Sequence, residues 1–359
     1  MSIPIATLPL RLAAMRNVVL AACLVVSTGV GFAAGETRIT DSTGRQVAVP
    51  AEIKRVYAAG APASLFVYAL AAPKLIGWTR ALRPEEAAFL PPQYGDLPEL
   101  GRLTGRGNTA NVEVVLAAKP DLIVDAGSLA ATFASLADRV QEQTGISYLL
   151  FDGSFAQTAQ TLRTLGGVLG ETARGKELAQ YVDNTLAEIA KRVATVPLEK
   201  RPRVYYARSP SGLQTALSGS INVEVLDALG AINVAGTIGQ GSGGLAGVSL
   251  EQVLAWDPEV IVTIDPNFYA VVRNHPAWAS VRAVRARRVY LSPHLPFGWF
   301  DFPPGPNRMI GLQWLAKTLY PDLFKEDLRP KILEFYRLFY HQEPSAAQLA
   351  ALLADGTMP

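Results

Sequence analysis

The sequence predicts an α/β protein with two Rossmann-like lobes, each built on a mainly parallel sheet, joined by one long α-helix. Three observations lead to this fold class. Short β-branched segments alternate with helical stretches from residue 55 onward, a pattern typical of parallel sheets covered by helices. One helix–strand segment occurs twice, and a long amphipathic segment lies between the two copies.

Seven segments are expected to form the strands of the two sheets, because they are short, apolar and rich in β-branched or aromatic residues. They are residues 55–58, 75–77, 122–125, 148–151, 203–207, 260–264 and 288–291. Ahead of them, residues 39–47 are expected to form a hairpin. Its turn falls on Ser42, Thr43 and Gly44, which are residues that favour tight turns.

The repeated segment consists of residues 111–124 and 249–262, at a constant offset of 138. Both copies carry Glu, Val-Leu-Ala, Pro and Ile-Val at the same positions. Each copy predicts a helix capped by Asn111 or Ser249, a proline that ends the helix, and then a buried strand. The two lobes are therefore expected to be two versions of one unit.

Residues 172–193 are expected to form the helix that connects the lobes. Apolar residues recur there at spacings of three and four, at Leu178, Val182, Leu186, Ile189 and Val193. This is the pattern of an amphipathic helix, and its length is about 33 Å at 1.5 Å per residue. The expected organisation is an N-terminal lobe over 36–170, the connecting helix over 171–196, and a C-terminal lobe with C-terminal helices over 197–359.

The first 35 residues have the composition of a secretory signal peptide. Arg11 and Arg16 precede an apolar run over 17–30, and small residues follow over 31–35. The run is shorter than the roughly 20 residues that a transmembrane helix needs. A bacterial lipoprotein box ending at Cys23 is the alternative, although the apolar run continues past this cysteine. Both interpretations predict export, and we expect a periplasmic protein.

Composition excludes several classes of function. The formal charge is +2, and removal of the first 35 residues with their two arginines leaves 31 basic and 31 acidic residues. No nucleic-acid partner is expected from such a balance. One cysteine and three histidines argue against direct ligation of a transition metal, so no resident cofactor is expected. No Gly-x-Ser-x-Gly, Walker or His-Glu-x-x-His motif occurs, and we expect no enzyme.

The hairpin over 40–45, the loop over 59–64, the two repeats and the connecting helix together resemble a known family over residues 36–340. This family comprises the periplasmic substrate-binding proteins, of the helical-backbone class III type, that serve ABC importers of ferric siderophores, haem and cobalamin. The resemblance implies a two-lobe protein with little hinge closure that holds a ligand between its lobes and delivers it to an ABC permease in the inner membrane. We expect the protein to be a monomer.

A ferric siderophore, an iron(III) chelate, is the leading ligand class. A chelate brings its own coordination sphere and needs mainly arginine and aromatic side chains. Haem, cobalamin and an oxyanion such as molybdate or tungstate remain alternatives within the same fold. A ligand sensor and an extracytoplasmic enzyme are alternatives of another class.

Candidate ligand-binding residues come from loops at the expected carboxyl ends of the strands, where open α/β sheets bind their ligands. Arginines there could bind anionic groups and aromatic side chains could bind planar ones. The loop over 297–308 is stiffened by prolines and glycines, which lowers the cost of ordering it around a ligand. The candidates are Pro62, Ser64, Trp78, Arg80, Ser128, Tyr206, Arg208, Tyr269, Trp299, Phe300, Asp301 and Arg308.

Two of these choices have structural alternatives. Trp78 could equally be a core residue, and Asp301 could cap the helix that begins near Arg308. The family resemblance implies a different role for Glu113 and Glu251, which lie at equivalent positions of the repeat. One glutamate of each lobe is expected to meet arginines of the permease, although an acid in a first helical turn is also favoured by the helix dipole alone.

Overall fold

The computed structural model describes residues 36–105, 109–237 and 244–354. Its strands form two parallel sheets and two antiparallel pairs. The strands are β1 (Glu36–Thr40), β2 (Gln46–Pro50), β3 (Val56–Ala58), β4 (Leu122–Gly127), β5 (Ser147–Asp152), β6 (Arg203–Ala207), β7 (Gln214–Ala216), β8 (Ile232–Asn233), β9 (Leu245–Gly247), β10 (Val260–Thr263) and β11 (Val289–Leu291).

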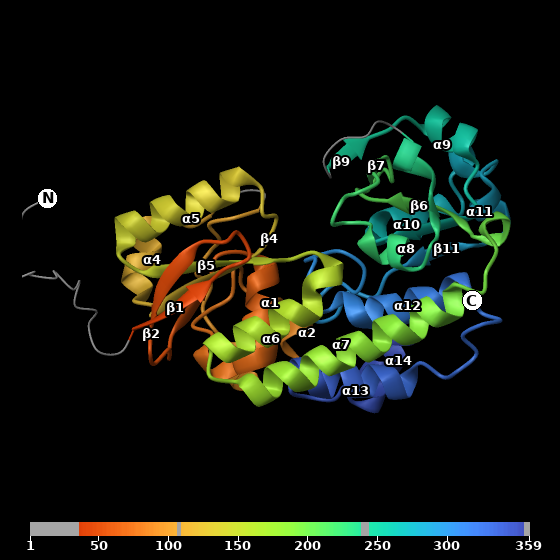
Figure 1. The fold of residues 1–359 in the computed structure, drawn as a ribbon. Helices are drawn as coiled ribbons and strands as arrows, with labels where there is room; N and C mark the ends of the chain where they lie inside the picture. The colour runs from red at the N-terminus through yellow and green to blue at the C-terminus, as the bar shows by residue number, and fades with distance from the viewer. Residues whose placement is uncertain (1–35, 106–108, 238–243, 355–359) are drawn as a thin grey trace, which may run out of the picture. The chain divides into compact units, whose positions relative to one another are not determined.

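Helices follow most of the strands, as the alternating pattern predicts (Figure 1). The α-helices are α1 (Ala61–Ala71), α2 (Pro84–Ala87), α3 (Pro92–Gly95), α4 (Val112–Ala118), α5 (Ala131–Thr144), α6 (Thr158–Val168), α7 (Thr172–Val193), α8 (Glu224–Ala228), α9 (Leu250–Trp256), α10 (Pro266–Val272), α11 (Arg282–Arg285), α12 (Arg308–Leu319), α13 (Arg329–Tyr340) and α14 (Ala346–Ala354). Short 3₁₀ turns are η1 (Ala72–Lys74), η2 (Phe155–Gln157), η3 (Leu198–Lys200), η4 (Val234–Thr237) and η5 (Pro276–Trp278).

The first sheet has the order β3-β4-β5 and is parallel throughout. Successive side chains of a strand point to opposite faces, and both faces here are buried. Val124 and Leu149 belong to the main hydrophobic core, which also contains residues of α1 and α6. Ile123 and Tyr148 face the other way and pack with residues of α4 and α5. Helices on both faces explain why these strands are continuous apolar runs.

The second sheet has the order β11-β10-β6-β8 and is also parallel. Tyr206 and Val262 are paired across β6 and β10 and belong to the same main core as the first sheet. Tyr205 and Ile261 are paired one position earlier and pack in a separate cluster with residues of α9 and α10. One hydrophobic core is therefore shared by the two lobes, while the other face of each sheet packs in a separate cluster of its own.

Helix α7 has the bounds that the amphipathic pattern predicts, and it packs against α6 of the first lobe and α12 of the second (Figure 1). The α6–α7 contact depends on two glycines. A Cβ atom added to Gly166 would lie 2.8 Å from the Cα of Gly175, so a larger residue there would push the helices apart. Because α7 and the shared core span both lobes, the structure favours a fixed arrangement over a wide hinge.

The predicted hairpin and six of the seven predicted strands are confirmed by the structure. The exception is 75–77, where Leu75 makes a single bridge to Val56 and no strand forms. Strands β7, β8 and β9 were not anticipated, because their sequences (Gln-Thr-Ala, Ile-Asn and Leu-Ala-Gly) contain no run of β-branched or aromatic residues.

The C-terminal helices, expected to belong to the second lobe, also contact the first lobe. The Tyr68 hydroxyl of α1 donates to the Tyr340 carbonyl of α13 at 2.9 Å, and His341 lies 2.9 Å from the Tyr68 carbonyl. The predicted signal peptide and Cys23 lie outside the described residues. Within the described residues, no helix has both the length and the apolar character that crossing a membrane requires.

Candidate functional site

A pocket of about 530 Å³ lies where residues 80–86 of the first lobe approach residues 264–302 of the second. This volume is in the range of small-molecule sites. Two of its segments follow the carboxyl ends of β10 and β11, where parallel sheets bind ligands. The lining residues are Arg80, Ala81, Arg83, Glu86, Ile264, Pro266, Ser292, Pro293, His294, Pro296, Phe297, Gly298 and Phe302.

A larger hollow of about 660 Å³ lies elsewhere, between the β1–β2 hairpin and the end of α6. Its lining includes Ile53 and Lys54, which precede β3. It therefore lies at the amino ends of the first sheet, on the side opposite to the usual ligand edge. We take the smaller pocket at the carboxyl ends as the candidate binding site.

Two arginines of the pocket are held by one buried carboxylate. Arg80 donates to both oxygens of Glu86, at 2.7 Å each, and Arg83 donates to Glu86 Oε1 from two nitrogens, at 2.7 and 3.0 Å. Glu86 is 2% exposed. The side chains of Arg80 and Arg83 are 46% and 54% exposed. Two guanidinium groups are thus fixed in orientation while they remain open to the pocket, which suits the binding of an anion.

The charge balance of this cluster favours Arg80 as the principal anion contact. Burial raises the pKa of Glu86, but hydrogen bonds from Arg80 and Arg83 outweigh it and hold this pKa below its ordinary value. Glu86 is therefore ionised at neutral pH and neutralises one of the two cations. Arg83 also pairs with Glu85 at 3.3 Å, and Glu85 does not line the pocket.

The second lobe supplies an apolar wall to the same pocket. Phe302 is 58% exposed, an unusual position for a large aromatic residue. Its loop is held by its own hydrogen bonds: Gly298 N–H donates to the Phe302 carbonyl at 2.9 Å, and Asn307 donates to the Pro303 carbonyl at 2.9 Å. An exposed aromatic on a rigid loop is a ready contact for an apolar part of a ligand.

Asp301 fixes this loop to the body of the second lobe. Its carboxylate is fully buried and accepts hydrogen bonds from the Tyr206 hydroxyl at 2.6 Å, from Arg208 and from Asn222. Burial raises the pKa of the Tyr206 hydroxyl well above its ordinary value, and the nearby Asp301 charge raises it further. The structure thus brings three predicted residues together as a buried polar cluster, and this cluster positions Phe302.

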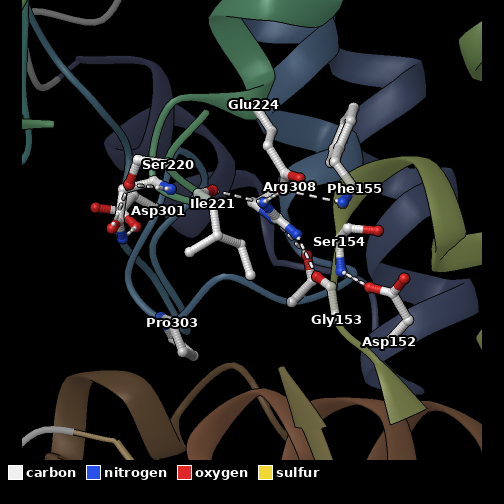
Figure 2. A network of polar contacts seen from close by, with 12 residues as sticks. Asp152, Gly153, Ser154, Phe155, Ser220, Ile221, Glu224, Asp301, Pro303 and Arg308 are labelled. Atoms are coloured by element: carbon white, nitrogen blue, oxygen red, sulfur yellow. Dashed lines mark hydrogen bonds and ion pairs between the residues drawn. The ribbon is translucent and has the colours of Figure 1, made fainter. Parts of the chain in front are cut away.

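Arg308 links the two lobes through a second buried polar network (Figure 2). It is 1% exposed and donates to the carbonyl of Gly153, at 3.0 Å, and to that of Ile221, at 2.9 Å. Its carboxylate partner is Glu224, at 2.8 Å, which also accepts from the backbone N–H of Phe155 at 2.9 Å. Gly153 and Phe155 follow β5, whereas Glu224 is in α8, so this network crosses between the lobes.

Of the twelve residues predicted to bind ligand, Arg80 lines the pocket and the others do not. In α1, the Ser64 hydroxyl donates to the Ala61 carbonyl at 2.7 Å, and Pro62 occupies the first turn. Ser128 is exposed in the loop after β4. Tyr269 is half-buried, and the Cζ atom of the Arg273 guanidinium lies 4.8 Å from the centre of the Tyr269 ring.

The two tryptophans are core residues in this structure. Trp78 is 2% exposed and donates to the Tyr94 carbonyl at 2.7 Å. Trp299 is fully buried and donates to the Tyr336 hydroxyl at 3.3 Å. Phe300 is also fully buried, with its ring centre 4.4 Å from that of Tyr206. Their geometry is that of packing, and a role in ligand contact stays a prediction.

Sequence reasoning missed Arg83, Glu86 and Phe302. The segment Arg83-Pro84-Glu85-Glu86 has a proline at the first helical position and an acid at the third, which is a signature of a helix start. That signature would have placed Glu86 beside the backbone N–H of Arg83, to which it bonds at 2.9 Å.

Donor sets for a bare metal ion are not found in the part of the chain that the structure describes: no three His, Cys, Asp or Glu side chains gather there. The two glutamates with a predicted docking role, Glu113 and Glu251, are both exposed in the first turns of α4 and α9. The pKa of Glu251 lies below its ordinary value, because its own backbone N–H and the Ser249 hydroxyl bond to the carboxylate.

Comparison with known proteins extends over most of the chain. A family profile described as periplasmic binding protein matches residues 71–294. The structure of an ABC transporter solute binding protein from Sulfurospirillum deleyianum is 32% identical with a TM-score of 0.80, covering 88% of this chain and 99% of that chain. The molybdate-binding protein MolA of Haemophilus influenzae is 28% identical, covering 89% of this chain and 95% of its own. The ABC transporter substrate-binding lipoprotein YvrC of Bacillus subtilis is 24% identical, covering 80% and 87%.

Proposed function

This chain belongs to the periplasmic binding protein family, and on that premise we propose that it captures an anionic solute in the periplasm and delivers it to an ABC permease of the inner membrane. Capture takes place in the pocket lined by Arg80 and Phe302. Delivery uses the outer surface that carries Glu113 and Glu251. The protein acts as a carrier, and the ligand leaves it chemically unchanged.

The leading ligand is a negatively charged metal chelate, of the ferric siderophore class. The observation that carries this proposal is the pairing of two fixed guanidinium groups with an exposed aromatic residue in one pocket of about 530 Å³. The arginines would bind the anionic groups of the chelate, and Phe302 would cover its organic part. A chelated metal needs no ligands from the protein.

A molybdate-class oxyanion is the second candidate. It is favoured by the molybdate-binding relative from Haemophilus influenzae, which matches 89% of this chain. Arg80 and Arg83 would supply the hydrogen-bond donors for such an anion. The apolar wall would then have no partner on the ligand, so the contribution of Phe302 distinguishes the two candidates.

Elemental analysis and mass spectrometry of the protein purified from its native periplasm test this proposal. Iron in a stoichiometric complex with an organic anion is the expected result. Molybdenum or tungsten without an organic component would favour the second candidate. Calorimetric titration of the ligand-free protein with a ferric chelate and with molybdate should then rank the two affinities. Absence of binding to any anion would contradict the proposed function.

Replacement of Phe302 by alanine is expected to weaken binding of a ferric chelate by about tenfold, because one well-packed aromatic contact is worth about 1–2 kcal/mol. Molybdate affinity should change by less than twofold. The matched control is Val271→Ala, which truncates another exposed apolar side chain (49%) outside the pocket. Equal effects on both ligands in titration calorimetry would remove Phe302 from the ligand contact.

A further inference from the structure

The two copies of the repeated helix are held in place by the same kind of contact. At the end of α4, the Arg55 side chain donates to the Ala118 carbonyl at 2.8 Å. At the end of α9, the Arg203 side chain donates to the Trp256 carbonyl at 2.8 Å. Ala118 and Trp256 are equivalent positions of the repeat. Arg55 directly precedes β3, and Arg203 is the first residue of β6. Both helices are therefore fixed to the sheet behind them in the same way.

Each helix is anchored in the core by one fully buried valine and exposes the residue that follows it. Val115 and Val253 are both 0% exposed. The next residues, Leu116 and Leu254, are 45% and 36% exposed and are equivalent positions of the repeat. A single exposed leucine is ordinary on a protein surface. An exposed leucine at the same position of both copies requires an explanation that applies to both.

The leucines lie three residues after the exposed carboxylates of the same helices. Residues three apart lie on the same side of an α-helix, so Glu113 and Leu116 form one patch and Glu251 and Leu254 form another. The carboxylate and the leucine together give each patch a charged half and an apolar half. Each lobe thus presents the same combination of groups.

We infer that Leu116 and Leu254 are the apolar half of a docking surface that is present once on each lobe and contacts the two subunits of the permease. This inference rests on the proposed function. A surface displayed twice on one chain fits a partner that offers its complement twice, as a pair of equivalent subunits does. Each subunit would present an apolar depression for the leucine beside a cation for the glutamate. The apolar contact supplies affinity, and the charges supply orientation.

The test is the stimulation of ATP hydrolysis by the cognate permease–ATPase complex in proteoliposomes, titrated with the exported protein. Leu116→Ser and Leu254→Ser should each raise the half-saturating concentration about threefold, and the double variant about tenfold. The two single variants should have similar effects, since the two patches are equivalent. Glu113→Ala combined with Glu251→Ala is the comparator that removes the charged half.

Leu198→Ser is the matched control, because Leu198 is 67% exposed and has no counterpart in the repeat; it should leave the titration unchanged. Thermal melting should show all leucine variants folded, as exposed substitutions shift stability by about 0.5 kcal/mol or less. Loss of stimulation in the glutamate variant with an unchanged titration in the leucine double variant would overturn the inference and leave the proposed function standing. Absence of stimulation by the unmodified protein would overturn both.

Discussion

Replacement of Arg80 by alanine is expected to weaken the binding of the anionic ligand by roughly 10- to 150-fold. Hydrogen bonds to a charged partner contribute about 1.5–3 kcal/mol, which corresponds to this range. The pocket is preserved in this variant because Glu86 keeps its three bonds from Arg83, two from the side chain and one from the backbone N–H. Titration calorimetry at low and at physiological ionic strength measures the loss.

Three further variants separate the roles within the cluster. Arg83→Ala should have the smaller effect, because Glu85 already offsets part of the Arg83 charge. Arg80→Lys should recover only part of the affinity, since an ammonium group lacks the planar fork of a guanidinium. Arg329→Ala is the control, because this exposed arginine pairs with Asp327 and does not line the pocket. Equal affinities for Arg80→Ala and the unmodified protein would exclude Arg80 from the site.

The predictable part of the fold is the part that depends on short-range patterns. The predicted strands of both sheets are buried on both faces, so they appear in the sequence as continuous apolar runs. Asn111 and Ser249 cap their helices as predicted, because a capping side chain bonds within its own turn. Strands β7 (Gln-Thr-Ala) and β9 (Leu-Ala-Gly) pair with each other and contain no continuous run of β-branched or aromatic residues.

The site was less predictable because burial depends on contacts between distant segments. Trp78 and Phe302 are both aromatic residues that follow expected strands in the sequence, yet Trp78 is 2% and Phe302 58% exposed. The difference arises from the aromatic residues packed around Trp78, including Tyr68 and Phe297, which are far apart in the sequence. Arg80 and Arg308 are likewise both arginines in segments that follow expected strands, and the sequence predicts the same ligand-binding role for each. One lines the pocket, and the other is enclosed by Gly153, Ile221 and Glu224.

Replacement of Glu224 by alanine is expected to lower the free energy of unfolding by about 3 kcal/mol, the lower end of the range for breaking a buried ion pair. Glu224 is 25% exposed but Arg308 only 1%, so the variant leaves a buried guanidinium without its carboxylate. The backbone N–H of Phe155 loses its acceptor as well. Urea unfolding followed by tryptophan fluorescence measures the loss.

The Arg308–Glu224 pair should behave as a coupled unit because it joins the segment after β5 in one lobe to α8 and α12 of the other. Arg308→Met removes the charge and keeps a similar stem, so Glu224→Ala combined with Arg308→Met should cost less than the sum of the single changes. The control is Glu326→Ala, which breaks the exposed pair with Arg192 (2.6 Å) and should cost less than about 1 kcal/mol. Strict additivity of the two changes would mean that Arg308 and Glu224 do not stabilise the junction of the lobes through each other.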